Sequence, residues 1–173
     1  MLNNWKAGSY FQGFLVLLCF TVFLLSFLWL YVQFAGSSFV HEILVLNAKA
    51  VGAVCSIFGV DTIVREQIIH SRTISLEIVP ECTSLPYLAI FFAGIIAFPT
   101  DVRQKFWGIL LGVIGLSFLN IIRMISLLLV GMFIPSVFDS AHILVGQSLM
   151  IVASVVLWIF WWQRTLIDDG IQP

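Results

Sequence analysis

Three side chains capable of chemistry stand at the edges of long apolar stretches. They are Cys82 in "VPECTSLPY", Arg123 in "NIIRM" and His142 in "FDSAHILVGQ". A cysteine attacks as its thiolate, and a histidine can take the thiol proton and later return it to a leaving amine. An arginine can hold a developing oxyanion or a substrate carbonyl where the dielectric constant is low. The three residue types would together support nucleophilic acyl transfer.

The three side chains are expected at one depth in a membrane. Each belongs to a different apolar stretch, and an α-helix rises 1.5 Å per residue. Counted from the far end of its own stretch, Arg123 lies about 27 Å away, Cys82 about 26 Å and His142 about 30 Å. A hydrocarbon core is about 30 Å thick, so all three are predicted at its rim. Contact between them further requires the helices to bring them together laterally.

Polar neighbours surround the Cys82 thiol. A helix is predicted to begin near Ser84, with Pro86 in its first turn, where the missing N–H costs little. The N-terminus of a helix favours negative charge, which supports a thiolate. Glu81 opposes this effect, and Thr83 and Ser84 complete the polar group as supporting residues.

Two more polar residues are candidates for a supporting role. Asn120 lies one turn before Arg123 and can orient the guanidinium or donate a hydrogen bond. An arginine inside a span costs at least about 2.5–3.5 kcal/mol, so it usually faces the protein interior and has partners. Asp139 precedes His142 by three residues, where it either orients the imidazole or serves as a solvated loop acid or helix cap.

Each of these residues also has a purely structural interpretation. Arg123 can snorkel outward to lipid phosphates, and His142 can be an interfacial histidine. Cys82 can be an inert small residue or pair with Cys55 outside the membrane, since three cysteines leave at least one unpaired. A metal site joining His142 to the other two histidines has no supporting spacing, so no metal and no cofactor is predicted.

Composition places the chain in a membrane. Of its 173 residues, 61% are hydrophobic and 10% are charged, and the mean hydropathy is +1.09. Soluble domains carry about 25% charged residues. The net charge of −1 gives no sign of nucleic-acid binding. The prediction is a single all-α membrane domain over residues 1–173, with a small extracytoplasmic β-hairpin.

Four transmembrane helices are predicted from the apolar stretches. They cover about residues 11–34, 84–98, 106–133 and 141–162, and the second is the shortest. The first is too long for the apolar core of a cleaved signal peptide and is interpreted as a retained span.

The segment 35–82 is predicted to lie outside the cytoplasm. Residues 41–59 carry apolar positions at helical spacing, which indicates an amphipathic helix on the outer leaflet. A fifth span is the alternative, which Lys49 near its middle disfavours. Residues 74–79 alternate in character, and residues 61–79 are predicted to form a small hairpin that turns near residues 70–72.

Basic residues set the predicted orientation. Those in the short segments are Lys6, Arg103, Lys105 and Arg164, and all fall on one side. By the positive-inside rule this side is cytoplasmic. Both termini are then inside, and the three reactive side chains face outward.

The quoted motifs resemble the exosortase/archaeosortase family of multi-pass transpeptidases. In that family a cysteine followed by Ser or Thr and usually Gly precedes Asn-x-x-Arg and then His. Cys82, Asn120, Arg123 and His142 match this order over about residues 59–162, and the chain resembles compact members that consist of the core domain alone. Ser84 replaces the usual Gly, which matters if the backbone there must be tight; a serine can instead cap the helix.

The resemblance implies a reaction, a substrate and a location. Cys82, Arg123 and His142 would cleave a C-terminal sorting signal, made of a short motif, an apolar helix and a basic tail. The acyl group would pass through a Cys82 thioester to an acceptor such as a surface glycan or lipid. Substrate and enzyme would both sit in the cytoplasmic membrane of a prokaryote.

Two other classes of protein remain open. One is a non-enzymatic membrane component of a polysaccharide-export or surface-assembly system. The other is a small transporter or proton relay, although no internal repeat or paired Gly/Pro break favours transport. Neither class needs a thiol, so Cys82 is the residue that separates them from an enzyme.

Overall fold

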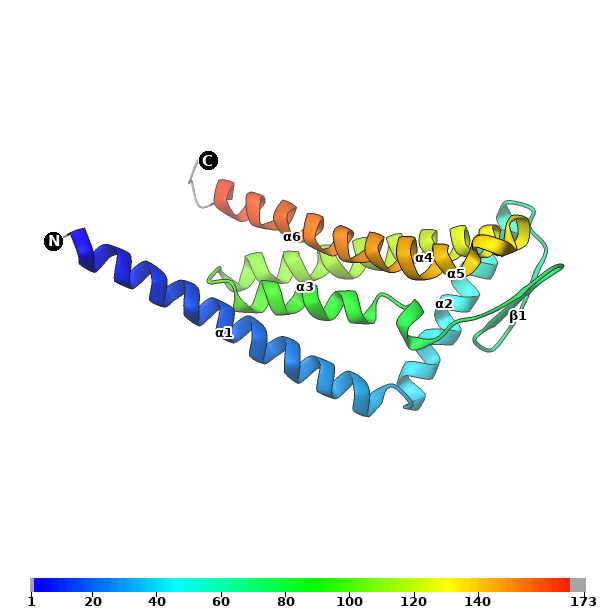
Figure 1. Ribbon diagram of the computed structural model, residues 1–173, viewed down its shortest axis with the longest axis horizontal. Coiled ribbons are helices and arrows are strands. Elements are labelled where there is room, and N and C mark those ends of the chain that lie inside the picture. The colour runs from blue at the N-terminus through cyan, green and yellow to red at the C-terminus, as the bar shows by residue number, and fades with distance from the viewer. Residues whose placement is uncertain (1, 169–173) are drawn as a thin grey trace.

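Helices account for most of the computed structural model, which describes residues 2–168; the side chains of residues 2–10, 139, 144, 145, 167 and 168 lie outside the description. Four helices run lengthwise through the molecule, and a fifth, α2, lies at a steep angle to them beside a small sheet (Figure 1). Their bounds are α1 Leu2–Phe34, α2 Ser38–Ile57, α3 Leu85–Ala97, α4 Val102–Phe133 and α6 Ser148–Asp168. The prediction of an all-α membrane protein is confirmed.

Four helical segments within the described residues are long and apolar enough to cross a membrane. They are Phe11–Phe34, Ser38–Ile57, Val102–Phe133 and Ala141–Leu166. This set includes α2, which was expected on the outer leaflet, and leaves out the predicted second span. α3 has only 13 residues, or about 20 Å of helix. It is short because an extended residue, Thr83, and a 3₁₀ turn, Pro80–Cys82, precede it.

α2 is amphipathic, as its spacing predicted. Ser37 caps its start by accepting a hydrogen bond from the amide of Val40. Its buried face packs on the sheet and on α4, and consists of Val40, Leu44, Ala48, Val51, Gly52 and Cys55. Lys49 stays exposed on the opposite face. The helix therefore supports the same end of the bundle as the sheet.

The sheet has three antiparallel strands rather than the two of the predicted hairpin. They are β1 Thr62–Arg65, β2 Ile68–Ser71 and β3 Ser75–Glu77, in the order β1-β2-β3. The turn expected near residues 70–72 joins β2 to β3. An additional turn at Glu66, whose φ is 53°, joins β1 to β2. The predicted hairpin included residues 62–71, but the break that divides them into β1 and β2 was not predicted, because Glu66 is not a typical turn residue.

α4 carries Asn120 and Arg123, and residues at each of its ends determine where the helix begins and where it stops. Asp101 and Gln104 form a capping box at its start. Pro135 begins a 3₁₀ turn directly after its end, Pro135–Val137. The chain then passes through a short helix, α5 Phe138–Ser140, and a π-helical turn, Ala141–Gln147, into α6. The turn that leads into α6 contains His142.

The buried residues form two separate clusters. A sheet-side cluster joins α2, the sheet and part of α4; its buried members are Val40, Leu44, Ala48, Val51, Cys55, Ile69, Ile78, Cys82, Met124 and Leu128. An aromatic cluster joins α3, α4 and α6; its buried members are Tyr87, Leu88, Phe91, Ile95, Leu116, Met150 and Trp161. The side chain of Cys82 belongs to the sheet-side cluster. In the chain, Cys82 shortly precedes α3, whose residues belong to the aromatic cluster.

Candidate active site

Cys82 lies at the end of the 3₁₀ turn and is only 6% exposed. Its Sγ is 3.5 Å from Nε2 of His142, within the range at which a thiol and an imidazole nitrogen hydrogen-bond. The two residues come from segments 60 positions apart in the chain. The structure therefore brings together a thiol and a potential base from two different helices.

A local network fixes the backbone around Cys82. The Thr83 hydroxyl donates to the carbonyl of Pro80 at 2.7 Å and accepts from the amide of Leu85 at 3.3 Å. Asn120 donates from Nδ2 to the carbonyl of Cys82 at 3.0 Å. Thr83 and Asn120 are fully buried, so these bonds are shielded from water. The 3₁₀ turn is thus tied both to the start of α3 and to α4.

Arg123 is buried on α4 one turn after Asn120, with 3% of its surface exposed. Its Nη1 donates to Oδ1 of Asn120 at 3.4 Å. Nε and Nη2 donate to no group among the described residues. The guanidinium lies against the backbone of Gly146, where an added Cβ would be 2.8 Å from Nε. Arg123 is therefore a buried cation with two donors available for an anion, not a residue that snorkels to the surface.

His142 belongs to the π-helical turn that precedes α6. Its ring stacks on that of Phe138, with centroids 6.0 Å apart and planes at 28°. A π-turn accommodates one extra residue and changes the direction in which side chains point. The same turn places Gly146 against Arg123. One local irregularity thus positions both the imidazole and the contact surface of the guanidinium.

The other supporting residues have separate outcomes. Ser84 precedes α3, but its side chain makes no capping bond; its Oγ lies 3.3 Å from Oγ of Ser117 instead. The expectation of a serine cap is therefore wrong. The Ser84 φ of −74° is helical and does not require glycine. Glu81 is exposed, and the side chain of Asp139 lies outside the described residues.

The positions of the cysteines and of the other two histidines bear on two alternatives. One is a disulfide between Cys82 and Cys55, and the other is a metal site that includes His142. All three cysteines are free, so Cys82 is not paired with Cys55. His41 and His70 lie at the sheet, where they contact Gln67 at 3.1 Å and Ser75 at 2.8 Å. Among the described residues, they form no group of metal-ligating side chains with His142.

Two tyrosines near the site were not singled out by sequence. Tyr31 of α1 is close enough to Cys82 and Glu81 to interact with them electrostatically. Tyr87 of α3 interacts in the same way with Cys82 and Arg123. The sequence feature that could have indicated Tyr31 is its position, because it is a polar residue near the end of an otherwise apolar span.

Fold and site together define a helical membrane protein with a thiol, an imidazole and a buried guanidinium gathered at one end of its bundle. A family model described as transmembrane exosortase matches residues 8–160. The chain therefore belongs to the transmembrane exosortase family. The match includes most of α1, which precedes residues 59–162, over which the motifs resemble the family. No curated protein and no solved structure matches the chain.

Proposed function

We propose that this exosortase is a membrane-embedded cysteine transpeptidase that cleaves the C-terminal sorting signal of exported proteins. The observation that carries the proposal is the 3.5 Å contact between Cys82 Sγ and His142 Nε2, next to a buried Arg123 with two available donors. A thiol beside a base and near a fixed cation is the arrangement that acyl transfer through a thioester requires.

Each residue then has a defined task. His142 takes the thiol proton as the sulfur attacks the scissile carbonyl carbon, and it returns this proton to the amine as the C–N bond breaks. Arg123 stabilises the negative charge that develops on the carbonyl oxygen. Asn120 holds the Cys82 carbonyl and Arg123 at once. An acceptor nucleophile, either a surface glycan or lipid or water, then attacks the thioester and releases the thiol.

The position of the site supports a membrane-anchored substrate. Arg103 and Lys105 belong to the first turn of α4, and Arg164 lies near the end of α6. These helix ends lie at the opposite end of the bundle from the turn that precedes α3 (Figure 1), so the positive-inside rule directs the thiol outward. In this orientation the basic tail of the substrate stays in the cytoplasm while its motif reaches Cys82. The proposed location is the cytoplasmic membrane, with both termini inside.

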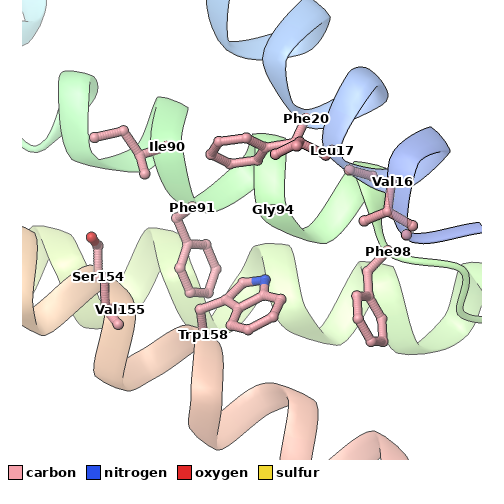
Figure 2. A pocket seen from close by; sticks show the side chains of 12 residues that line it. Val16, Leu17, Phe20, Ile90, Phe91, Gly94, Phe98, Ser154, Val155 and Trp158 are labelled. Carbon is pink, nitrogen blue, oxygen red and sulfur yellow. The ribbon is translucent and has the colours of Figure 1, made fainter. Parts of the chain in front are cut away.

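An apolar cavity of about 370 Å³ lies between α1, α3 and α6 (Figure 2). Phe20 of α1, Phe91 of α3 and Trp158 of α6 all line it. The same three helices lead from the cavity to the end that carries Cys82. A hydrocarbon-lined cavity has no partner for a charged segment but matches apolar side chains, which supports an apolar helix as the anchor of the substrate.

The test is processing of a reporter that carries a C-terminal signal of motif, apolar helix and basic tail, co-expressed with the full chain. The wild-type protein is expected to shorten the reporter, and Cys82→Ala is expected to leave it at full length. Cys55→Ala is the matched control, because Cys55 is a second buried free thiol outside the site. A reporter still shortened by Cys82→Ala would exclude Cys82 as the nucleophile.

A further inference from the structure

Gly146 is a buried glycine in the π-helical turn Ala141–Gln147, four residues after His142. The guanidinium of Arg123 lies where its side chain would be, because a Cβ added to Gly146 would stand 2.8 Å from Nε and 3.3 Å from Nη2. Cβ atoms essentially never come within 3.0 Å of such a neighbour. A side chain at residue 146 and the observed position of the guanidinium therefore exclude each other.

The two atoms that this Cβ would meet are the two donors of Arg123 that remain available. Nη1 donates to Oδ1 of Asn120 at 3.4 Å, whereas Nε and Nη2 donate to no described residue. Nε and Nη2 form one edge of the planar guanidinium, and such an edge can donate two parallel hydrogen bonds to an anion. Gly146 thus lies against the available edge, while Asn120 holds the third nitrogen.

The backbone of the turn does not itself require a glycine at this position. The φ of Gly146 lies outside the left-handed region, and alanine is the better helix former. The carbonyl oxygen of Ala141 would lie 3.4 Å from the added Cβ, which is ordinary van der Waals contact. The guanidinium is therefore the group that an added methyl would displace. Because it is the end of a flexible side chain, it can move without moving the backbone.

We propose that Gly146 is a positioning residue for acyl transfer: its missing side chain lets the guanidinium of Arg123 lie against the π-turn, with the Nε–Nη2 edge in place for the oxyanion. The inference rests on the proposed function, in which Arg123 stabilises the charge on the carbonyl oxygen. An alanine would move this edge and leave the contact between Cys82 and His142 in place.

Two thiol reagents distinguish oxyanion stabilisation from a general effect on Cys82. With p-nitrophenyl acetate the sulfur attacks the carbonyl carbon, and His142 takes the thiol proton. The carbonyl π pair moves to oxygen as the C–S bond forms, and collapse of this oxyanion expels p-nitrophenolate and leaves an acetyl thioester. Iodoacetamide is attacked at its methylene carbon, and iodide leaves without an oxyanion. Only the acetylation depends on the guanidinium.

The experiment uses the full chain in detergent, with Cys19→Ser and Cys55→Ala so that Cys82 is the only thiol. Initial rates of both modifications are followed by mass spectrometry that locates the modified residue. Gly146→Ala is expected to lower the acetylation rate at least about tenfold, because a misplacement of about 1 Å can cost about 10²-fold. The alkylation rate should not change.

The matched control is Gly115→Ala on α4. Its Cβ would also meet the end of a flexible side chain, the Cδ1 atom of Leu157 at 3.1 Å. Both rates should stay equal to those of the parent protein, because Leu157 takes no part in the proposed reaction.

A double-mutant cycle with Arg123→Met shows whether Gly146 acts through the guanidinium. Arg123→Met alone should slow acetylation by about 10²-fold. Gly146→Ala added to it should have no further effect, because no guanidinium is left to displace. A glycine with a purely structural role would lower the rate by the same factor in both backgrounds.

The results that would overturn the inference are distinguishable. Unchanged acetylation in Gly146→Ala would show that the contact does not matter to the reaction. An equal loss of both rates would show that the methyl disturbs the thiol or His142, and a loss that persists with Arg123→Met would show a cause other than the guanidinium. If Arg123→Met is acetylated as fast as the parent, or if the parent reacts with neither reagent, the proposed function fails together with this inference.

Discussion

At the end of the bundle that carries Cys82, polar side chains are buried between helices, whereas the opposite end is filled with aromatic rings. Near the thiol, the side chains of Asn120, Thr83 and Arg123 are each at most 3% exposed. At the other end the Phe98 ring packs edge-on against three tryptophans, Trp158, Trp161 and Trp162, at centroid distances of 5.8–6.2 Å. One end holds polar groups in fixed positions, and the other supplies packing.

The two ends of the bundle also differ in how α4 meets its neighbours. At the aromatic end, Trp161 donates to the carbonyl of Gln104 at 2.9 Å, and Gly108 and Gly112 allow large rings to lie directly against α4. At the site end the chain between α4 and α6 contains a 3₁₀ turn, a short helix and a π-turn. Irregular backbone is thus concentrated where the reactive side chains are. From this difference we expect substitutions at the site end to change activity and substitutions at the aromatic end to change stability.

The largest expected effect of breaking this separation is at Arg123. Arg123→Met should reduce reporter processing by about 100-fold or more, because it removes the cation that faces the developing oxyanion. Its thermal stability in detergent should stay equal or rise, because an apolar side chain of similar length replaces a buried charge, two of whose donors bond to no described residue.

Processing is measured by immunoblot of the reporter. Stability is measured by size-exclusion chromatography, as the loss of monodisperse protein after heating. Arg103→Met, an exposed arginine at the other end, is the control and should process normally. Normal processing by Arg123→Met would show that the guanidinium takes no part in the reaction. A strong loss of stability would show that Arg123 is needed for the fold.

An intermediate effect is expected at Gly108 in the aromatic cluster. A Cβ there would overlap the buried ring of Trp161, which does not line the apolar cavity, so Gly108→Ala should lower the free energy of unfolding by about 1–3 kcal/mol. Processing per folded molecule should be unchanged. Gly13→Ala is the matched control, since its Cβ would meet no atom within 4 Å. A variant that stays stable but loses activity would contradict the division between the two ends.

The smallest effect is expected at Ser84, which lies at the boundary between the site and α3. Ser84→Gly removes the contact with Ser117, at a cost of about 0.5–1.5 kcal/mol, and processing should remain within about twofold of wild type. Ser117→Ala should cost a similar amount, and the double variant should cost little more than either single one. A large gain in processing with Ser84→Gly would mean that substrate needs closer access to the backbone here.

Much of the fold was predictable because the helices are long and apolar. The start of α3 was expected near Ser84, and the helix α2 was expected from its spacing. The helical stretch Ala141–Leu166 begins where it was expected, but α6 itself starts at Ser148, after the π-turn. The three-stranded sheet was not expected, because the pairing of β1 with β2 depends on a turn at Glu66 in the left-handed region. The shortness of α3 was expected, since residues 84–98 formed the shortest predicted span, and α3 covers Leu85–Ala97. The 3₁₀ turn and the extended residue before it were not expected, because hydropathy does not report them.

For the candidate site, the sequence predicted depth but not contact. Helix rise placed Cys82, Arg123 and His142 at one level, and the structure adds the Cys82–His142 contact. The bond from Asn120 to the Cys82 carbonyl was not foreseen, because a pattern along one helix cannot specify a backbone acceptor on another. The π-turn was equally hidden, since one extra residue in a helix leaves the apolar pattern almost intact.

The shortness of α3 also has a consequence for the environment of the thiol. A helix of about 20 Å leaves about 10 Å of a typical hydrocarbon core unmatched. Because α3 packs on α1, α4 and α6 and Ile96 is its only exposed side chain, this depth is filled by protein and not by lipid. Under the proposed function, a scissile bond just beyond an apolar anchor would meet Cys82 beside the buried polar side chains of Thr83 and Asn120, and not in hydrocarbon.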